Sequence, residues 1–231
     1  MLRIYGQMLL SRVVEECWIN NIVVISVNTD GIETIIPKNK IKLYDSIISG
    51  IEKEFKVKFE SADYIKIVYK NVNNYIAITS SEIKQKGSSF IIKPLLGNSN
   101  DFLVIPKALN KYFVNGIKPE TILNNKEWNK HFHIFDFCAS YKISKKYTVL
   151  YNNQKQQQLN RFFVSEKGYY LYKQKKGKNM ENVLKGFGVE LLNRYDKNRV
   201  EYKIDFKYYL SKINEIINEL ESKQTTMHTL W

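Results

Sequence analysis

An Asp-Gly step between two runs of β-branched residues constrains the fold of this chain more than any other feature. Asn28-Thr29-Asp30-Gly31 separates the apolar run 22–27 from the run 32–36. Such a step is among the strongest short-range signals for a β-hairpin, because glycine accepts the positive φ that a tight turn needs. The sequence therefore predicts a hairpin with the carboxylate of Asp30 at its tip. Taken alone, the pattern fits both a plain turn and a carboxylate held for metal binding.

Apolar periodicity predicts the elements around the hairpin. Helical spacing predicts helices over 6–20 and 41–55, and strand-like runs over 64–68 and 75–78 follow. An order of helix, hairpin, helix and strands is typical of an antiparallel sheet with helices on one face. We therefore expect residues 1–80 to form one α+β domain.

Beyond residue 80 the composition of the sequence changes: it contains short clusters of Ser, Gly, Asn and Pro, and a long basic stretch. We expect a second, mostly helical domain over 81–222 with a few short strands, followed by a flexible tail over 223–231. Its expected elements are helices from 105 to about 113, at 119–120 and over 205–221, and strands over 147–150, 161–165 and 169–173. The overall fold class expected is α+β.

Positive charge is concentrated in the second part of the chain. The net charge is +13, and residues 81–231 hold 26 of the 36 basic residues but 14 of the 23 acidic ones. Residues 140–178 carry ten cations against Glu166 alone. This imbalance predicts a polyanionic partner, although a Lys-rich composition also arises from an AT-biased genome.

Size and composition indicate a folded protein. The chain has 231 residues, of which 44% are hydrophobic, and no apolar stretch approaches the roughly 18 residues needed to cross a bilayer. No signal peptide is visible at the N-terminus. Cys17 and Cys138 lie far apart without metal-ligand spacing, which fits a reducing compartment. We expect a soluble protein of the cytoplasm, or of the host cytoplasm if the protein is viral, without a membrane partner.

Several segments, in order, resemble the end of the palm and the thumb of family B DNA polymerases of the viral or phage type. They are 2–7 with the helix after it, 28–31, 72–77, 105–112, and 158–165 with Lys167-Gly168. The segment 28–31 resembles the third polymerase motif, and 72–77 resembles the strand at the junction of palm and thumb. The resemblance assigns 1–80 to the C-terminal part of the palm and 81–222 to the DNA-binding thumb.

The resemblance implies a DNA-directed DNA polymerase, a nucleotidyltransferase of DNA replication. Such enzymes join a dNTP to a primer hydroxyl with two Mg²⁺ ions. Asp30 is then the catalytic residue and metal ligand, with Asn28, Thr29 and Gly31 near the active site; Asn28 stands where the family has its first Asp. One carboxylate cannot hold two Mg²⁺ ions, so a second carboxylate is expected from an N-terminal polymerase fragment. Alone, the chain is expected to be inactive.

The resemblance also implies that primer–template DNA is the partner of the thumb. Tyr75 matches a family tyrosine near the primer strand, and Asn73 replaces the usual lysine. The residues expected to contact DNA are Lys66, Lys70, Asn73, Tyr75, Lys142, Lys145, Lys146, Arg161, Lys167 and Lys173.

The last residues resemble the peptide by which polymerases dock on a sliding clamp. Gln224, Met227, Leu230 and Trp231 have the corresponding spacing, with Gln224 at the rim and the apolar residues in a pocket. A frayed terminus with chance hydrophobic residues is the alternative.

Two other functions fit the sequence. One is a non-enzymatic, duplex-binding module that retains a vestigial hairpin, and the other is an unrelated basic α+β nucleic-acid binder. His131 and His133 resemble a metal pair in spacing, but because no Cys or carboxylate cluster lies at a suitable spacing we interpret them as packing or phosphate-contacting residues.

Overall fold

The computed structural model of the chain describes residues 2–71, 73–87, 89–92, 101–124, 127–199 and 201–228. The chain divides into two compact units, Met1–Asp63 and Tyr64–Trp231. Both units combine helices with antiparallel strand pairs, which confirms the predicted α+β class. The division falls before residue 64, so the strands expected at 64–78 belong to the second unit rather than to a domain over 1–80.

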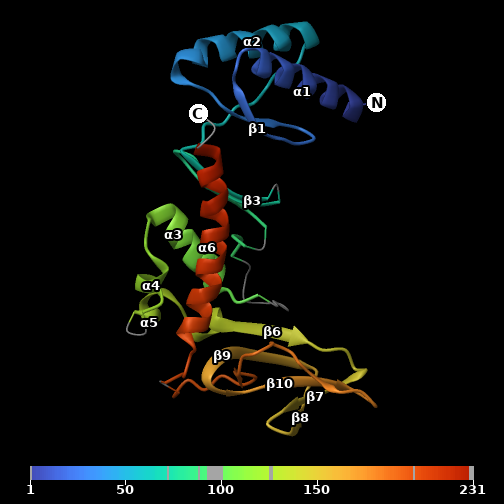
Figure 1. Cartoon of the computed structure of the whole chain (residues 1–231), viewed down its shortest axis with the longest axis vertical. Coiled ribbons are helices and arrows are strands. Elements are labelled where there is room, and N and C mark those ends of the chain that lie inside the picture. The colour runs from blue at the N-terminus through green and yellow to red at the C-terminus, as the bar shows by residue number, and fades with distance from the viewer. Residues whose placement is uncertain are drawn as a thin grey trace. The chain divides into compact units, whose positions relative to one another are not determined.

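The first unit consists of a hairpin and two helices. Its elements are α1 (Leu2–Ile19), β1 (Val23–Val27), β2 (Ile32–Ile35), the 3₁₀ turn η1 (Lys38–Lys40) and α2 (Ile41–Phe55) (Figure 1). Val24 and Ile32 of the hairpin pack against the buried residues Val13 and Ile51 of the helices. One face of the hairpin is therefore covered by helices, as the sequence predicts.

The end of α1 determines where the hairpin begins. Asn21 takes a left-handed conformation, with φ of 51°, and the amide of Ile22 donates to the carbonyl of Cys17 at 2.8 Å. This bond pattern is a Schellman motif, in which a residue at positive φ reverses the chain after a helix. Lys40 Nζ donates to the carbonyl of Asn20 at 2.7 Å, which ties η1 to the same helix end.

The second unit contains most of the strands. Its elements are β3 (Lys66–Asn71), β4 (Asn74–Ile78), β5 (Ile83–Lys86), α3 (Val104–Asn115), α4 (Pro119–Ile122), α5 (Trp128–His131), η2 (Ile134–Phe137), β6 (Cys138–Lys142), β7 (Tyr147–Tyr151), β8 (Gln154–Gln156), β9 (Leu159–Tyr169), β10 (Leu171–Lys175), β11 (Met180–Asn182), β12 (Val189–Leu191) and α6 (Phe206–His228). Among the described residues the strands order as β3-β4-β5, β12-β9-β6 and β11-β10-β7-β8. Figure 1 shows α3 and α4 beside the long helix α6, with β6 to β10 gathered at one end of that helix.

The second unit is richer in strands than the expected mostly helical domain. The expected helices are present as α3, α4 and α6, and the expected strands as β7, β9 and β10. The difference lies in five short strands, β5, β6, β8, β11 and β12, of three to five residues each. Strands this short have too few residues to show a period of two in the sequence.

A network of aromatic rings joins α6 to the sheets in the core of the second unit. Tyr209 of α6 is fully buried and lies 5.2 Å from the ring of Phe137, centroid to centroid. Its hydroxyl donates to the carbonyl of Phe137 at 2.6 Å and accepts from the amide of Val164 at 2.9 Å. Tyr209 therefore connects α6, η2 and β9 through both packing and hydrogen bonds.

In the part of the chain that the structure describes, no helix is both long and apolar enough to cross a lipid bilayer.

Candidate functional site

Asp30 lies at the exposed tip of the β1–β2 hairpin. Val27 pairs with Ile32, and the amide of Asn28 donates to the carbonyl of Gly31 at 2.8 Å. Thr29 and Asp30 thus form the tip, and the side chains of both are exposed. The hairpin therefore presents one accessible carboxylate on β-structure that the two helices support.

Gly31 does not have the backbone conformation that the sequence predicts. None of the residues 28–31 takes a positive φ in the left-handed range. A Cβ added at Gly31 would meet no atom within 4 Å. The turn is therefore formed without the conformational freedom of glycine, and the predicted requirement for Gly at this position is wrong.

The residues around Asp30 do not complete a site for two Mg²⁺ ions. Glu33, the other carboxylate of the hairpin, lies on β2 and pairs with Ser26 of β1. Burial raises the pKa of the Glu33 carboxyl group. Within the described ranges, no three His, Cys, Asp or Glu side chains group so that they could hold a metal ion. The Asn28 side chain supplies at most a neutral amide oxygen, so the described residues of the hairpin offer one accessible carboxylate, that of Asp30.

Lys66 and Lys70, both expected to contact DNA, have partners on helices of their own unit. Lys66 Nζ donates to the carbonyl of Phe113 at 3.1 Å, in the last turn of α3. Lys70 Nζ lies 3.6 Å from Glu219 of α6. Both lysines flank the buried Val68 on β3, so their side chains attach the sheet to these helices.

Tyr75 is half-buried on a face of the β3-β4-β5 sheet that also carries lysines. Tyr69 and Tyr75 pair in register, with ring centroids 5.6 Å apart, and Tyr75 also pairs with Lys86. Directly opposite residues of an antiparallel pair point to the same face. Tyr69, Tyr75, Lys84 and Lys86 form what we call the Tyr75 face. Asn73 lies exposed in the adjoining β3–β4 turn, where its amide donates to Asn71 Oδ1 at 3.0 Å.

Lys84 and Lys86 were not predicted from the sequence to contact DNA. Their signal is the alternation Ile83-Lys84-Gln85-Lys86, which is typical of a strand with one charged face. Lys84 pairs with Glu82 at 3.1 Å, whereas Lys86 is exposed. On this sheet Lys66 is exposed but bonded to α3, Lys70 is half-buried and paired with α6, and Lys84 and Lys86 add two exposed cations that were not predicted.

The structure brings several predicted DNA-contacting residues together around Tyr147. Lys146 and Lys173 each place their Nζ 5.4 Å from the centroid of the Tyr147 ring, and Lys175 pairs with Tyr147 in register. Lys145 precedes them in the same loop and is exposed. We call Lys145, Lys146, Tyr147, Lys173 and Lys175 the Tyr147 cluster. The positive charge of Lys173 is neutralised by an ion pair, because its Nζ lies 3.0 Å from Glu181.

Lys142 is exposed at the end of β6, ahead of the loop that contains the Tyr147 cluster. No acidic partner for Lys142 or Lys145 exists among the residues that the structure describes. Two of the predicted cations are thus available to a phosphate without breaking an ion pair.

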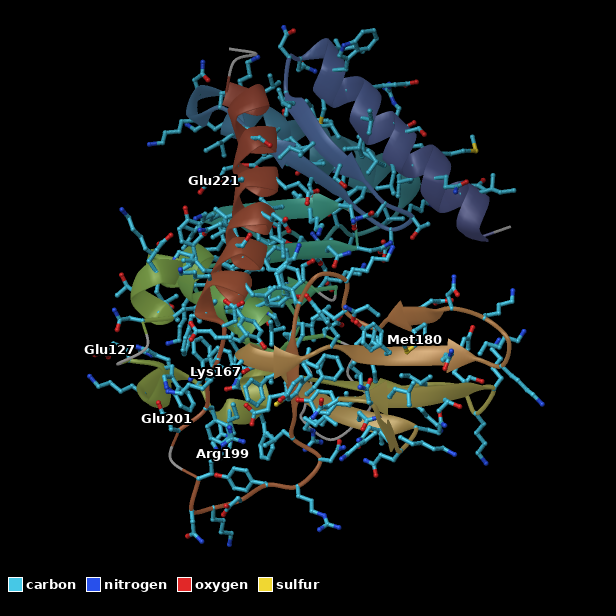
Figure 2. All side chains as sticks on the ribbon, turned by 60° about the horizontal axis from the view of Figure 1, so that its bottom comes forward. Glu127, Lys167, Met180, Arg199, Glu201 and Glu221 are labelled. Carbon is cyan, nitrogen blue, oxygen red and sulfur yellow. The ribbon has the colours of Figure 1, made fainter. Side chains whose placement is uncertain are left out.

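Arg161 and Lys167 lie on β9, apart from that cluster in strand register. The guanidinium of Arg161 lies 5.1 Å from the centroid of the Phe135 ring, and Arg161 pairs with Ser140 of β6. Lys167 is exposed, and Figure 2 shows it in the same region as Glu201. The contacts described above therefore do not join the ten predicted DNA-contacting residues into one continuous patch.

His133 has an exposed side chain that forms hydrogen bonds within its own turn. Its Nδ1 accepts from the amide of Phe135 at 3.4 Å, and its own amide donates to Asp136 Oδ2 at 2.8 Å. These bonds cap η2 at its N-terminus. His131 is the last residue of α5 and is exposed.

The predicted clamp-binding residues lie outside the described side chains. The backbone of α6 continues through His228, so a helix is present where a flexible tail from residue 223 was expected. The side chains of Gln224 and Met227, and all of Leu230 and Trp231, are not among those described.

Comparison of the sequence with models of known protein families found no match. A comparison with curated protein sequences found no match either.

Proposed function

We propose that this chain is the palm-and-thumb portion of a DNA-directed DNA polymerase of family B. The observation that carries the proposal is the position of Asp30, exposed at the tip of a hairpin that α1 and α2 support. Rigid β-structure holds a carboxylate precisely, which metal-assisted phosphoryl transfer requires. The order of the segments that resemble the family adds to this support.

In this proposal the catalytic centre is shared between polypeptides. Two Mg²⁺ ions would stabilise the attacking and leaving oxygens of the transferred phosphate when bound. Asp30 contributes one carboxylate, and the remaining acidic ligands and the dNTP contacts come from polypeptide outside this chain. The buried, free thiols of Cys17 and Cys138 agree with a reducing compartment such as the cytoplasm.

The second unit then holds the primer–template DNA. The Tyr147 cluster and the Tyr75 face each combine tyrosine rings with lysines, and Lys86, Lys145 and Lys146 are exposed. Lysines neutralise phosphates without reading the base sequence, which suits a polymerase that must move along any template.

The test of the catalytic role is primer extension by a complex of this chain with the polypeptide that supplies the other half. Asp30→Ala should lower the extension rate by on the order of a hundredfold or more, because a preorganised charge at the reacting phosphate is lost. Asp45→Ala, which removes an exposed carboxylate of α2, is the matched control and should extend at the wild-type rate. Equal rates for Asp30→Ala and wild type would remove Asp30 from the catalytic centre.

A non-enzymatic duplex-binding module is the second candidate, and the single accessible carboxylate of the hairpin favours it. Both candidates predict that DNA affinity falls steeply with salt, since each phosphate contact releases counterions. Replacing Lys145 and Lys146 by Gln should reduce the slope of log affinity against log salt by about two. Lys212→Gln, on α6 and paired with Glu215 at 2.7 Å, should leave the slope unchanged. A salt-independent affinity would contradict both candidates.

Docking of the tail on a sliding clamp remains part of the proposal. A peptide of residues 222–231, titrated against the clamp of the same replication system, should bind through Met227 and Trp231. Equal binding by the Met227→Ala and Trp231→Ala peptides would exclude this mode.

A further inference from the structure

A pocket of about 500 Å³ opens in the second unit between the α5–η2 segment and the side chains of Tyr195, Arg199 and Tyr202. Its walls include Lys107, Trp128, His131, Tyr195, Arg199 and Tyr202. Figure 2 shows Arg199 and Glu201 in this region, while Met180 lies at the far end of β10 and β11. The volume is within the range of sites that bind small molecules.

The lining of the pocket is rich in cations and poor in acids. Lys107, Lys130 and Arg199 contribute positive charge, and Asp136 is the acidic residue of the lining. Asp136 is only 2% exposed, and Lys107 Nζ lies 2.7 Å from its Oδ1. Asp136 and Lys107 therefore offset each other, which leaves Lys130 and Arg199 as the lining cations that can face an anionic ligand.

The two remaining cations are held by acids that are not part of the lining. Lys130 Nζ lies 3.0 Å from Glu127 and remains 69% exposed. Arg199 lies 2.5 Å from Glu190 through Nη1, and its Nε donates to the carbonyl of Glu201 at 3.0 Å. These two bonds orient the guanidinium. They use Nη1 and Nε, so Nη2 takes part in neither of them. An oriented guanidinium is well suited to a phosphate.

Aromatic rings form the other part of the wall. Tyr195 is 46% exposed, and its ring packs against His133 and Phe135 at centroid distances of 5.6 and 5.1 Å. The guanidinium of Arg199 lies 4.4 Å from the centroid of the Tyr202 ring. An exposed tyrosine ring fixed from behind offers a stacking surface for a nucleobase.

The hydroxyl of Tyr202 adds an independent observation. It is buried, and no described residue forms a hydrogen bond with it. Buried polar groups in folded proteins nearly always have a partner, and exceptions concentrate at functional sites. Tyr202, whose ring contacts the Arg199 guanidinium, therefore marks this part of the pocket wall as a candidate functional site.

We infer that this pocket binds a nucleotide, with its phosphate at Lys130 and Arg199 and its base against Tyr195. The nucleotide is either free or the 5′-phosphorylated end of a DNA strand, since both present the same chemistry. This inference goes beyond the proposed polymerase activity and does not depend on Asp30.

The test is a calorimetric titration of the full chain with adenosine 5′-monophosphate, adenosine and inorganic phosphate. Adenosine 5′-monophosphate should bind at least tenfold more tightly than either of the other two probes. Tyr195→Ala and Lys130→Gln should each weaken this binding severalfold, and Arg199→Gln more than tenfold. Because Arg199 also pairs with Glu190, the first two variants keep the test valid if Arg199→Gln does not fold.

Two matched controls separate this pocket from the other surfaces. Tyr170→Ala removes a tyrosine that is 45% exposed, close to the exposure of Tyr195. Lys212→Gln removes a lysine that, like Lys130, pairs with a Glu three residues away. Both controls should bind adenosine 5′-monophosphate like the wild type.

Two oligonucleotides, with and without a 5′-phosphate, identify the source of the ligand. Tighter binding of the phosphorylated strand than of the free nucleotide, lost in Tyr195→Ala, assigns the pocket to strand ends. The reverse order assigns it to free nucleotides. Equal affinities for Tyr195→Ala, Lys130→Gln and the two controls would overturn the inference, as would no binding of any phosphorylated probe. Primer extension by the Asp30→Ala complex does not enter this test, so the two proposals fail independently.

Discussion

The two units of the chain use their apolar residues differently. In the first unit, Val13, Cys17, Ile22 and Ile51 form the buried cluster. The buried cluster of the second unit is several times larger and includes a network of aromatic rings. The candidate catalytic carboxylate therefore lies on the unit with the smaller core, whereas the candidate DNA-binding surfaces lie on the unit with the larger one.

Helix α1 shows the difference most clearly. Besides its buried face, it exposes large apolar side chains. They are Ile4, Tyr5, Met8, Trp18 and Ile19, each at least 63% exposed. A helix that is apolar on more than one face is not stabilised fully by one small core. Stability within the first unit is thus expected to be low when that unit stands alone.

The largest effect should appear when the units are separated. A fragment of residues 64–231 should unfold cooperatively, because its core is large enough to offset the entropy of ordering the chain. A fragment of residues 1–63 should show no cooperative transition, because a chain of this length whose buried cluster has four residues is marginal. Thermal unfolding followed by circular dichroism measures both. A sharp transition in the shorter fragment would contradict the inference that the smaller buried cluster makes the first unit less stable.

Phe137→Ala tests the core of the second unit directly. Phe137 is fully buried and contacts the rings of Trp128, Phe132, Phe206 and Tyr209 at 5.2 to 5.9 Å. Its removal should lower the free energy of unfolding by about 3–5 kcal/mol, because a cavity remains among rings that cannot all move inward.

The control for this variant is Tyr170→Ala, which truncates a ring that is 45% exposed. It should cost less than about 1 kcal/mol. Chemical denaturation of the fragment 64–231 gives both values. If the two variants are equally destabilised, the ring network does not hold this unit together.

Alkaline pH should weaken the second unit more gradually. The hydrogen bond that the Tyr112 hydroxyl donates to Glu221, at 2.5 Å, raises the pKa of Tyr112 to about 12. Burial raises the pKa of Tyr208 to about 12. An unfolded tyrosine ionises near its ordinary pKa of about 10. Between these values the folded state keeps protons that the unfolded state has lost, so the free energy of unfolding decreases as pH rises.

Denaturant titrations at several pH values between about 9 and 12 measure this slope. The variants Tyr112→Phe and Tyr208→Phe should each flatten it, because neither state then has that proton to lose. A slope that both variants leave unchanged would place the alkaline sensitivity elsewhere, for example at Cys138, where burial raises the pKa of the thiol to about 12.

Elements with a local signal were predicted well from the sequence. The helix over 41–55 coincides with α2, and the hairpin strands over 22–27 and 32–36 contain β1 and β2. Their periodicity and turn residues lie within a few positions of one another. By contrast, β12 pairs with β9, and beside this pairing Gly188 closely approaches Gly168, twenty residues away in the chain. Such pairing has no counterpart in local periodicity.

The candidate site shows the same division. The tip position of Asp30 follows from the Asp-Gly step, which is local. The contacts of Lys66 with Phe113 and of Lys70 with Glu219 join residues far apart in the sequence, so the sequence does not distinguish these paired lysines from unpaired ones. Tyr195 and Arg199 were not identified, because only the tertiary fold brings their loop to α5.

The smallest expected effect concerns the turn residue itself. Gly31→Ala should change the free energy of unfolding by less than about 1 kcal/mol, since the backbone there has no positive φ and open space surrounds an added Cβ. Gly188→Ala is the matched comparison in the second unit. A Cβ at Gly188 would overlap the backbone carbonyl of Gly168, so β9 and β12 would have to separate. Chemical denaturation should show a large loss for Gly188→Ala alone. If Gly31→Ala lowers the free energy of unfolding as much as Gly188→Ala does, the hairpin requires glycine at position 31. The Asp-Gly step would then be explained by the turn alone and would give no support to a role for the accessible carboxylate of Asp30.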